Sequence, residues 1–177
     1  CINAQDSDEI VQLKIKTNVE VEFKTATLIK GERFNNSIQG LAGKSNQYGN
    51  LGSEIIKNLK RSKDMPSENA TTTIVSENDS PYEVIAWFDG IDTVYWYSEA
   101  YKVYLNKDCY SMFSSFYVAE DFDFEEFDAS KAESFHSMFQ RYGQKTKNAY
   151  IDLSSWNVEN VKESPYLFDA AGSYSDK

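Results

Sequence analysis

Hydrophobic and polar residues alternate almost perfectly between Val11 and Phe23. Nearly every second residue in this range is apolar, and the residues between them are charged or polar. A period of two is typical of a β-strand with one buried face, whereas a helix would distribute these apolar residues around its whole circumference. We therefore predict a half-buried strand over 11–23, with a fold in the chain at Thr17-Asn18.

After Phe23 the apolar residues no longer recur at every second position. Three apolar residues have the helical spacing i, i+4 and i+7: Phe34, Ile38 and Leu41. Because Gly43 follows as a stop signal, we predict a short amphipathic helix over Glu32–Ala42. The apolar group within 55–59 predicts a second short helix before Pro66. The segment between them, Gly43–Gly52, is rich in Gly, Ser and Asn and is predicted to be a loop.

The densest strand signal lies in the middle of the chain. Tyr82–Phe88 and Ile91–Tyr97 are rich in aromatic and β-branched residues, and Asp89-Gly90 separates them. Asp-Gly between two such runs is a strong hairpin signal. Tyr101–Leu105 is predicted to add a third strand to a small antiparallel meander, and Ile74-Val75 to form a short strand before it.

The last third of the chain repeats itself. A short motif recurs after 26 and then 29 residues, in the form Ser111-Met-Phe113, Ser137-Met-Phe139 and Tyr166-Leu-Phe168. Repetition at this interval indicates a solenoid, in which each unit covers the apolar face of its neighbour. Ile151 and Leu153 alternate with polar or amphipathic neighbours, which predicts a short strand lining the stack.

This pattern resembles the BspA-like leucine-rich surface repeat, a unit of about 26 residues in surface proteins of gut and oral bacteria and mycoplasmas. The match is carried by Ile151-Asp-Leu-Ser-Ser-Trp-Asn-Val-Glu-Asn-Val161 and by the Met-Phe pairs at 112–113 and 138–139. Segments within 34–98 are similar to the region that precedes such repeats. The sequence departs from the family at Ser164-Pro165 and at Phe127-Asp-Ala, which lacks the regular aliphatic strand.

The resemblance implies a fold, a location and a class of function. We expect an α+β fold, in which a small antiparallel aromatic sheet with one or two short helices precedes a short irregular leucine-rich-repeat-like solenoid. The expected division is a strand-rich unit over 1–105 and repeats over 106–177 that fold together with it. Family members act as surface adhesins or binding proteins, which implies an extracellular or cell-surface location and no catalytic residue.

Charge narrows the choice of partners. The chain has 28 acidic against 18 basic side chains, a net charge of −10. Nucleic acid and anionic membranes both attract cationic surfaces, so neither is expected as a partner. No apolar run approaches the roughly 20 residues that span a bilayer, so membrane insertion is not expected.

The chain has few histidine and cysteine side chains that could bind a metal or form a disulfide. One histidine, His136, and two cysteines, Cys1 and Cys109, cannot assemble an ordinary zinc site, and we expect no cofactor. The sequence does not decide whether Cys1 and Cys109 form a disulfide. Cys1 belongs to a signal-peptide remnant that ends before Gln5, carries a lipid, or merely starts the sequence; the first of these is preferred.

Aromatic residues make up 15% of the chain and suit a binding face as well as a core. The aromatic hairpin is the first choice for binding, through Trp87, Tyr95, Trp96 and Tyr97, although its pattern does not separate buried from exposed members. The expected partner is a host extracellular protein of the matrix, mucin or immunoglobulin type. The alternative is a glycan stacked on exposed tryptophans, which would make the chain a carbohydrate-binding module.

An enzyme is a third class, because Glu120–Asp128 holds six carboxylates in nine residues. Glycosidases use paired carboxylates, but these flank a cleft, whereas this run alternates with phenylalanines. We interpret it as a solvated face with a buried opposite face. An EF-hand is disfavoured because Glu126 and Ala132 replace its glycine and final glutamate. His136 and Cys109 have no flanking catalytic motif, and we predict that the chain is not an enzyme.

Overall fold

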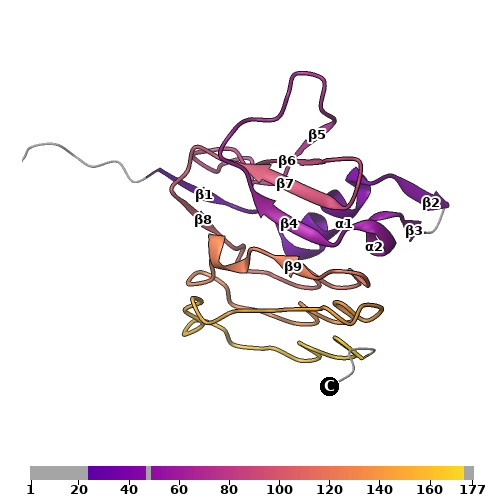
Figure 1. Cartoon of the computed structure of the whole chain (residues 1–177). Coiled ribbons are helices and arrows are strands. Elements are labelled where there is room, and N and C mark those ends of the chain that lie inside the picture. Colours follow the sequence, from indigo (N-terminus) through magenta and orange to yellow (C-terminus); the bar gives the residue numbers. More distant parts are fainter. Residues whose placement is uncertain (1–23, 47–48, 174–177) are drawn as a thin grey trace, which may run out of the picture.

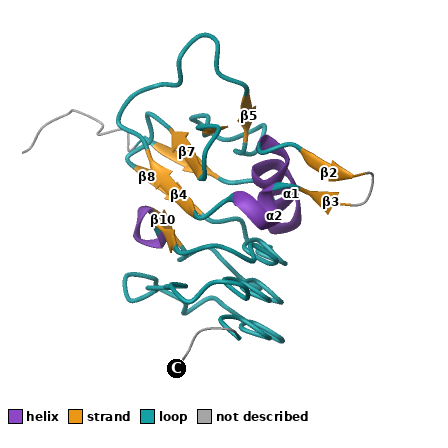
Figure 2. Ribbon diagram, turned by 45° about the vertical axis from the view of Figure 1, so that its right-hand side comes forward, coloured by secondary structure: helices purple, strands orange, loops and turns teal. Residues whose placement is uncertain are grey.

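The computed structural model describes residues 24–46 and 49–173, and within them it has three β-sheets, two α-helices, one 3₁₀ turn and a series of C-terminal loops. The sheets and helices lie together in the upper part of the molecule, and the loops are layered beneath them (Figures 1 and 2). The strand predicted over 11–23 lies outside the described residues.

The largest sheet has five strands. Their spatial order is β5 (Thr72–Ile74), β6 (Ile85–Phe88), β7 (Thr93–Tyr97), β4 (Asn58–Arg61) and β9 (Asp121–Phe122). The predicted hairpin of β6 and β7 is confirmed, with β5 antiparallel beside it. However, β4 lies parallel to both β7 and β9. The sheet is therefore mixed, and the prediction of an antiparallel sheet is wrong because parallel pairing joins distant segments that a local pattern does not connect.

The turn of the hairpin is built from the residues that predicted it. The Asp89 carboxylate accepts hydrogen bonds from the backbone N–H groups of Ile91, Asp92 and Thr93 at 2.8, 3.1 and 3.1 Å. Gly90 has a φ of 84°, which a residue with a Cβ adopts only at a cost. Asp89 therefore closes the turn with its side chain and Gly90 with its backbone.

Two smaller sheets differ from the predictions. The strand predicted at Tyr101–Leu105 exists as β8 (Lys102–Tyr104), but it does not extend the hairpin. It lies parallel between β1 (Thr25–Thr27) and β10 (Phe127–Asp128) in a separate sheet. A second difference falls in the predicted loop, where β2 (Lys44–Asn46) pairs antiparallel with β3 (Gly49–Asn50).

The first predicted helix is confirmed as α1 (Gly31–Leu41), whose Phe34 and Ile38 are buried. The second predicted helix is confirmed only at Ile55, its first apolar residue. The helix α2 (Gly52–Ile55) is a single turn, and Leu59 belongs to β4. Gly52 lets α2 approach α1, because a Cβ there would lie 2.5 Å from the Cα of Gln39.

The predicted leucine-rich-repeat-like solenoid is wrong. Within 129–173 the structure has no strand, so the strand predicted at Ile151 and Leu153 is also absent. Isolated bridges such as Ser134–Glu163 are the only β-type pairing between these successive loops. Residues with φ between 52° and 59° interrupt the loops: Ser111, Ser115, Ser137, Arg141, Tyr166 and Ala170. Because this conformation bends the chain away from the extended one, no strand can form across it. The described residues form one compact mixed-sheet domain with a shared core.

The structure confirms that the acidic run has one solvated face and one buried face. Phe122, Phe124 and Phe127 are buried, at 4%, 0% and 4% exposure, while the intervening Asp121 and Glu125 are exposed. The run bends through a 3₁₀ turn, η1 (Phe124–Glu126), between β9 and β10. Its phenylalanines join an aromatic core with Phe113 and Phe139, whose rings stack at 5.5 Å.

Three loop segments are joined by a ladder of backbone hydrogen bonds. We call 109–115 the first segment, 134–141 the second and 163–170 the third. The first segment donates N–H groups to carbonyls of the second at Ser134, His136, Met138 and Gln140. The second donates in the same way to Glu163, Pro165, Leu167 and Asp169. All of these bonds point in one direction along the stack.

Side chains of α1 supply donors to the other side of the first segment. The Asn35 amide donates to the carbonyls of Ser111 and Ser114 at 3.0 and 2.8 Å. Gln39, which is 5% exposed, donates to the Ser114 carbonyl at 3.3 Å. These amides satisfy backbone acceptors that no preceding segment covers, and thus join the helix to the loops.

Replacing Asn35 with alanine tests this junction. We expect Asn35→Ala to lower the free energy of unfolding by about 1–3 kcal/mol, because it removes hydrogen bonds to the carbonyls of Ser111, Met112 and Ser114 in a partly buried junction. The neighbouring Asn36 is exposed, and Asn36→Ala is the matched control with an expected change below about 0.5 kcal/mol. Urea denaturation measures both; equal effects would contradict the capping role.

Candidate functional site

The five-stranded sheet has one buried and one partly exposed face. Strand alternation sends Leu59, Val94 and Trp96 into the core. The register places Trp87 beside Tyr95 and Tyr95 beside Lys60 on the opposite side. We call this side the open face, and its residues are Asn58, Lys60, Ile74, Ile85, Trp87, Thr93, Tyr95, Tyr97 and Asp121.

Three of the four predicted binding residues lie on the open face. Trp87 and Tyr95 stack with ring centroids 5.9 Å apart and an interplanar angle of 26°. Tyr97 follows two residues later on the same side of β7, and all three side chains are partly exposed. The structure thus brings together an aromatic row across both strands of the hairpin, β6 and β7.

Trp96 belongs to the core instead. It is 1% exposed, stacks on Phe127 at 5.1 Å, and carries the Arg61 guanidinium 4.9 Å from its ring centroid. Its position between Tyr95 and Tyr97 in an extended strand forces it to the opposite face. The predicted surface role of Trp96 is therefore corrected to a packing role.

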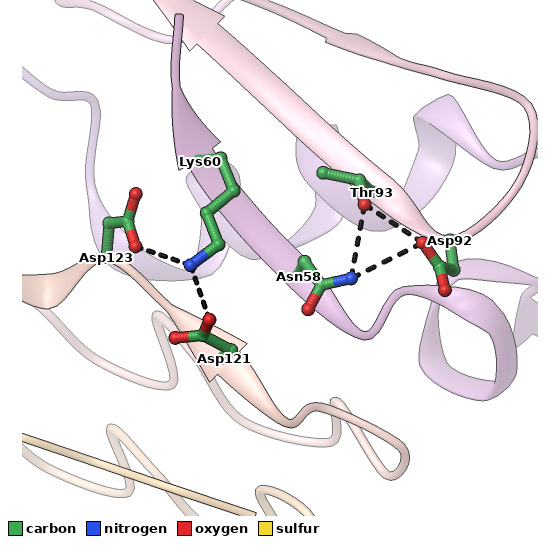
Figure 3. A network of polar contacts seen from close by, with 6 residues as sticks. All are labelled: Asn58, Lys60, Asp92, Thr93, Asp121 and Asp123. Carbon is green, nitrogen blue, oxygen red and sulfur yellow. Dashed lines mark hydrogen bonds and ion pairs between the residues drawn. The ribbon is translucent and has the colours of Figure 1, made fainter.

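A polar network borders the aromatic row, because Lys60 is the register partner of Tyr95. Figure 3 shows the side chains of this network. The Lys60 ammonium lies 2.6 Å from a carboxylate oxygen of Asp121 and 2.6 Å from one of Asp123. Partial burial lowers the pKa of Lys60, but the two carboxylates outweigh this effect and leave the pKa raised. Lys60 therefore stays charged and holds both aspartates at the β9 edge of the open face.

A second polar cluster lies at the start of β7. The Asn58 amide donates to a carboxylate oxygen of Asp92 at 3.3 Å and to the hydroxyl of Thr93 at 3.1 Å. The Thr93 hydroxyl in turn donates to Asp92 at 2.9 Å (Figure 3). Because these groups satisfy one another, they form a fixed polar border.

A hollow adjoins the aromatic row at the end of β7. It has a volume of about 490 Å³ and is lined by Tyr97, Arg61, Lys63 and Tyr101 among others. Arg61 is fixed there by Glu126 at 3.0 Å and by the Ala100 carbonyl. The recess therefore lies at the end of β4 and β7, between Tyr97 of the open face and Arg61, which lies over Trp96 on the other side of the sheet.

Sequence reasoning missed Asn58, Lys60 and Asp92. The signal for the first two was the alternation of Asn58-Leu59-Lys60, which is typical of a half-buried strand. The predicted second helix concealed it. Asp121 and Asp123 were recognised as part of the acidic run, but their common partner Lys60 lies about 60 residues away and depends on the β4–β9 pairing.

The other side chains that could bind a metal or take part in catalysis do not form a common site among the described residues. Within 24–46 and 49–173, no three His, Cys, Asp or Glu side chains are grouped to hold a metal ion. His136 contacts the rings of Tyr110 and Tyr166 at 5.2 and 5.9 Å. None of the described helices is long and apolar enough to span a membrane.

Cys109 is a buried, free thiol that donates to the Asn106 carbonyl at 3.0 Å. Burial raises its pKa, and the nearby Asp108 raises it further. The thiolate, which is the nucleophilic form, is therefore suppressed at neutral pH. Cys1 lies outside the described residues.

The burial of Cys109 predicts its reactivity. In a Cys1→Ser protein at pH 8, we expect a thiol-specific reagent to leave Cys109 unmodified while the chain is folded, and to modify it fully in urea. Mass spectrometry before and after unfolding measures this. Rapid stoichiometric modification of the folded protein would contradict the buried placement.

The two faces of the hairpin predict opposite responses to tryptophan removal. Trp96→Ala should lower the free energy of unfolding by about 3–5 kcal/mol because it empties a core site. Trp87→Ala should cost only about 1 kcal/mol, since it removes a ring stacked on a partly exposed surface. Urea denaturation of both variants measures the two changes. A larger loss of unfolding free energy for Trp87→Ala than for Trp96→Ala would contradict the placement of Trp96 in the core and Trp87 on the surface.

Neither curated proteins nor solved structures provide a match. The BspA-like resemblance stays a prediction. A family model matches residues 94–177, from within β7 to the C-terminal loops, and makes this part of the chain similar to a family described as Mycoplasma protein of unknown function, DUF285.

Proposed function

We propose that the chain is a non-catalytic binding module whose open face docks onto a host extracellular protein of the matrix, mucin or immunoglobulin type. The observation that carries this proposal is the aromatic row of Trp87, Tyr95 and Tyr97 on a partly exposed sheet face. In protein interfaces, Trp and Tyr supply much of the binding energy at low cost in side-chain entropy.

The surroundings of the row favour a protein as the partner. Ile85 and Ile74 extend the row with aliphatic surface, and Ile74 is 53% exposed. Lys60 and Asp121 provide a charged border on the opposite side. An apolar centre with a polar rim is the usual anatomy of a protein–protein interface, in which the rim excludes water from the central contacts.

The host and the location are proposed from the family resemblance. BspA-like proteins act at bacterial surfaces, and we propose the same extracellular or surface location for this chain. Its net charge of −10 favours a partner with a basic contact surface.

A glycan is the second candidate because Trp87 and Tyr95 are nearly parallel, with 26° between their rings. Such rings stack on the apolar faces of sugars, and the nearby carboxylates can accept sugar hydroxyls. The flanking isoleucines add surface that a sugar does not use, and this ranks the glycan second. A glycosidase is disfavoured because Asp121 and Asp123 share the ion pair with Lys60.

A pull-down with single-residue variants tests the proposal. Immobilised protein is incubated with serum, matrix extract and mucin, beside an equally acidic unrelated protein. We expect one host protein to be enriched, and Trp87→Ala or Tyr95→Ala to weaken its binding at least about tenfold because each removes a central contact. Tyr110→Ala, at an aromatic residue that is 41% exposed and does not belong to the open face, is the control.

The outcomes separate the candidates. Enrichment that Trp87→Ala abolishes and Tyr110→Ala preserves supports protein binding through the open face. Binding to a glycan array with the same sensitivity, and no enriched protein, selects the carbohydrate-binding alternative. Retention of all binding by both open-face variants would refute the proposed site.

A further inference from the structure

The side chains of the open face are ordered in rows that run across its strands. Strand pairing gives two neighbouring rows, one of Ile74, Ile85 and Tyr97 and one of Trp87, Tyr95 and Lys60. Where both rows cross the same strand, their members are two residues apart, which is a distance of about 7 Å. Along a row, neighbouring side chains are about 4.8 Å apart, the spacing of paired strands. The aromatic side chains therefore stand at defined intervals in two directions.

The interval along the second row matches the repeat of a polyproline II helix. This conformation rises about 3.1 Å per residue with three residues per turn, so residues i and i+3 lie about 9 Å apart on the same side. From Trp87 across Tyr95 to Lys60 the row spans two strand spacings, about 9–10 Å. A polyproline II segment lying along this row would contact Trp87 with one residue and the polar border at Lys60 with the third residue after it.

The aromatic side chains also have the chemistry that a proline-rich segment needs. Proline rings pack on aromatic surfaces, and because their conformation is fixed in the free peptide, binding costs little conformational entropy. Proline has no N–H to donate, so the carbonyls of such a segment need donors from the protein. Trp87 provides an indole N–H, and Tyr95 and Tyr97 provide hydroxyls. The open face thus offers both ring surface and hydrogen-bond donors.

The border beside the aromatic row is negatively charged. Lys60 carries one positive charge, whereas its two ion-pair partners, Asp121 and Asp123, carry two negative charges (Figure 3). Asp92, which is bonded to Asn58 in the same border, adds a third carboxylate. The side chain of Asp121 is 61% exposed and accessible to a partner. Because three carboxylates face one ammonium, this border attracts a basic side chain.

We propose that the open face binds a proline-rich segment of the partner protein in the polyproline II conformation, with a lysine or arginine at its β9 end. The inference rests on the proposed function, because it names the ligand of the same face. The prolines pack on Trp87, Tyr95 and Tyr97, and the basic side chain pairs with Asp121. Matrix collagens and mucin-like stalks are rich in proline, and this chemistry selects them among the proposed partner types.

Fluorescence anisotropy with a labelled polyproline peptide that carries one arginine is the first measurement. We expect saturable binding to the whole chain, weakened at least about tenfold by Trp87→Ala and by Tyr95→Ala because each removes a central contact. Tyr110→Ala, outside the open face, should leave binding unchanged. A glycine–serine peptide of equal length and charge is a flexible coil and should not bind. Equal binding of the two peptides would contradict polyproline II recognition.

A change of charge tests the position of the basic side chain. Replacing the arginine of the peptide with glutamate should weaken binding by about threefold or more at low salt, because like charges then meet at the border. Asp121→Asn should weaken binding of the arginine peptide about threefold and leave that of an all-proline peptide unchanged. Equal affinities of the arginine and glutamate peptides would refute the proposed pairing with Asp121.

The indole N–H signals in an NMR titration report the contact in the unaltered protein. The chain has three tryptophans, of which Trp96 and Trp156 are 1% and 8% exposed. We expect the arginine peptide to shift the indole signal of Trp87 and to leave the other two in place. Trp87→Phe, which removes one signal, assigns it. An unmoved Trp87 signal at saturating peptide would place the ligand elsewhere and overturn the inference.

Failure of this inference can be told apart from failure of the proposed function. If capture of a host protein depends on Trp87 but the peptide does not bind, the polyproline ligand is wrong and the proposed function stands. If both open-face variants retain all capture of the host protein, the proposed function fails, and this inference fails with it. Release of the captured host protein by excess peptide supports both.

Discussion

The ring of Phe113 is the point at which the parts of this molecule meet. It packs edge-on against Phe34 of α1 at 5.8 Å, against Phe122 of β9 at 6.1 Å and against Phe124 of η1 at 5.1 Å, and it stacks on Phe139 below. Because one aromatic side chain contacts the helix, the sheet and the loops, these parts share a single core. Removing any of them would expose apolar surface of the others.

This shared core determines which surfaces remain for binding. The core occupies one face of the five-stranded sheet, and so the alternate residues Trp87, Tyr95 and Tyr97 are directed away from it. It also fixes the first loop segment, because Asn35 and Gln39 of α1 donate hydrogen bonds to its carbonyls.

The physical character of the open face follows from its side chains. The open face offers aromatic side chains with a fixed charged border, where Lys60 is held by two carboxylates. Side-chain surfaces of this kind select a partner by shape and charge.

Local patterns in the sequence were sufficient for the elements that depend on near neighbours. The helix at Gly31–Leu41, the β6–β7 hairpin with its Asp89-Gly90 turn, and the buried phenylalanines of the acidic run all follow from spacing and turn chemistry. The same patterns identified the aromatic row as a set. They did not separate Trp96 from its neighbours, because alternation gives two faces without saying which is buried.

Tertiary structure decided what depends on distant residues. The parallel pairing of β4 with β7 and β9 turned a predicted helix into a strand and brought Lys60 to Asp121 and Asp123. The left-handed residues of the loops prevented the strands of the expected solenoid. The sequence by itself determined local conformation and a stock of aromatic and acidic side chains. Only the fold decided which of them face water, because burial is set by contacts between segments far apart in the chain.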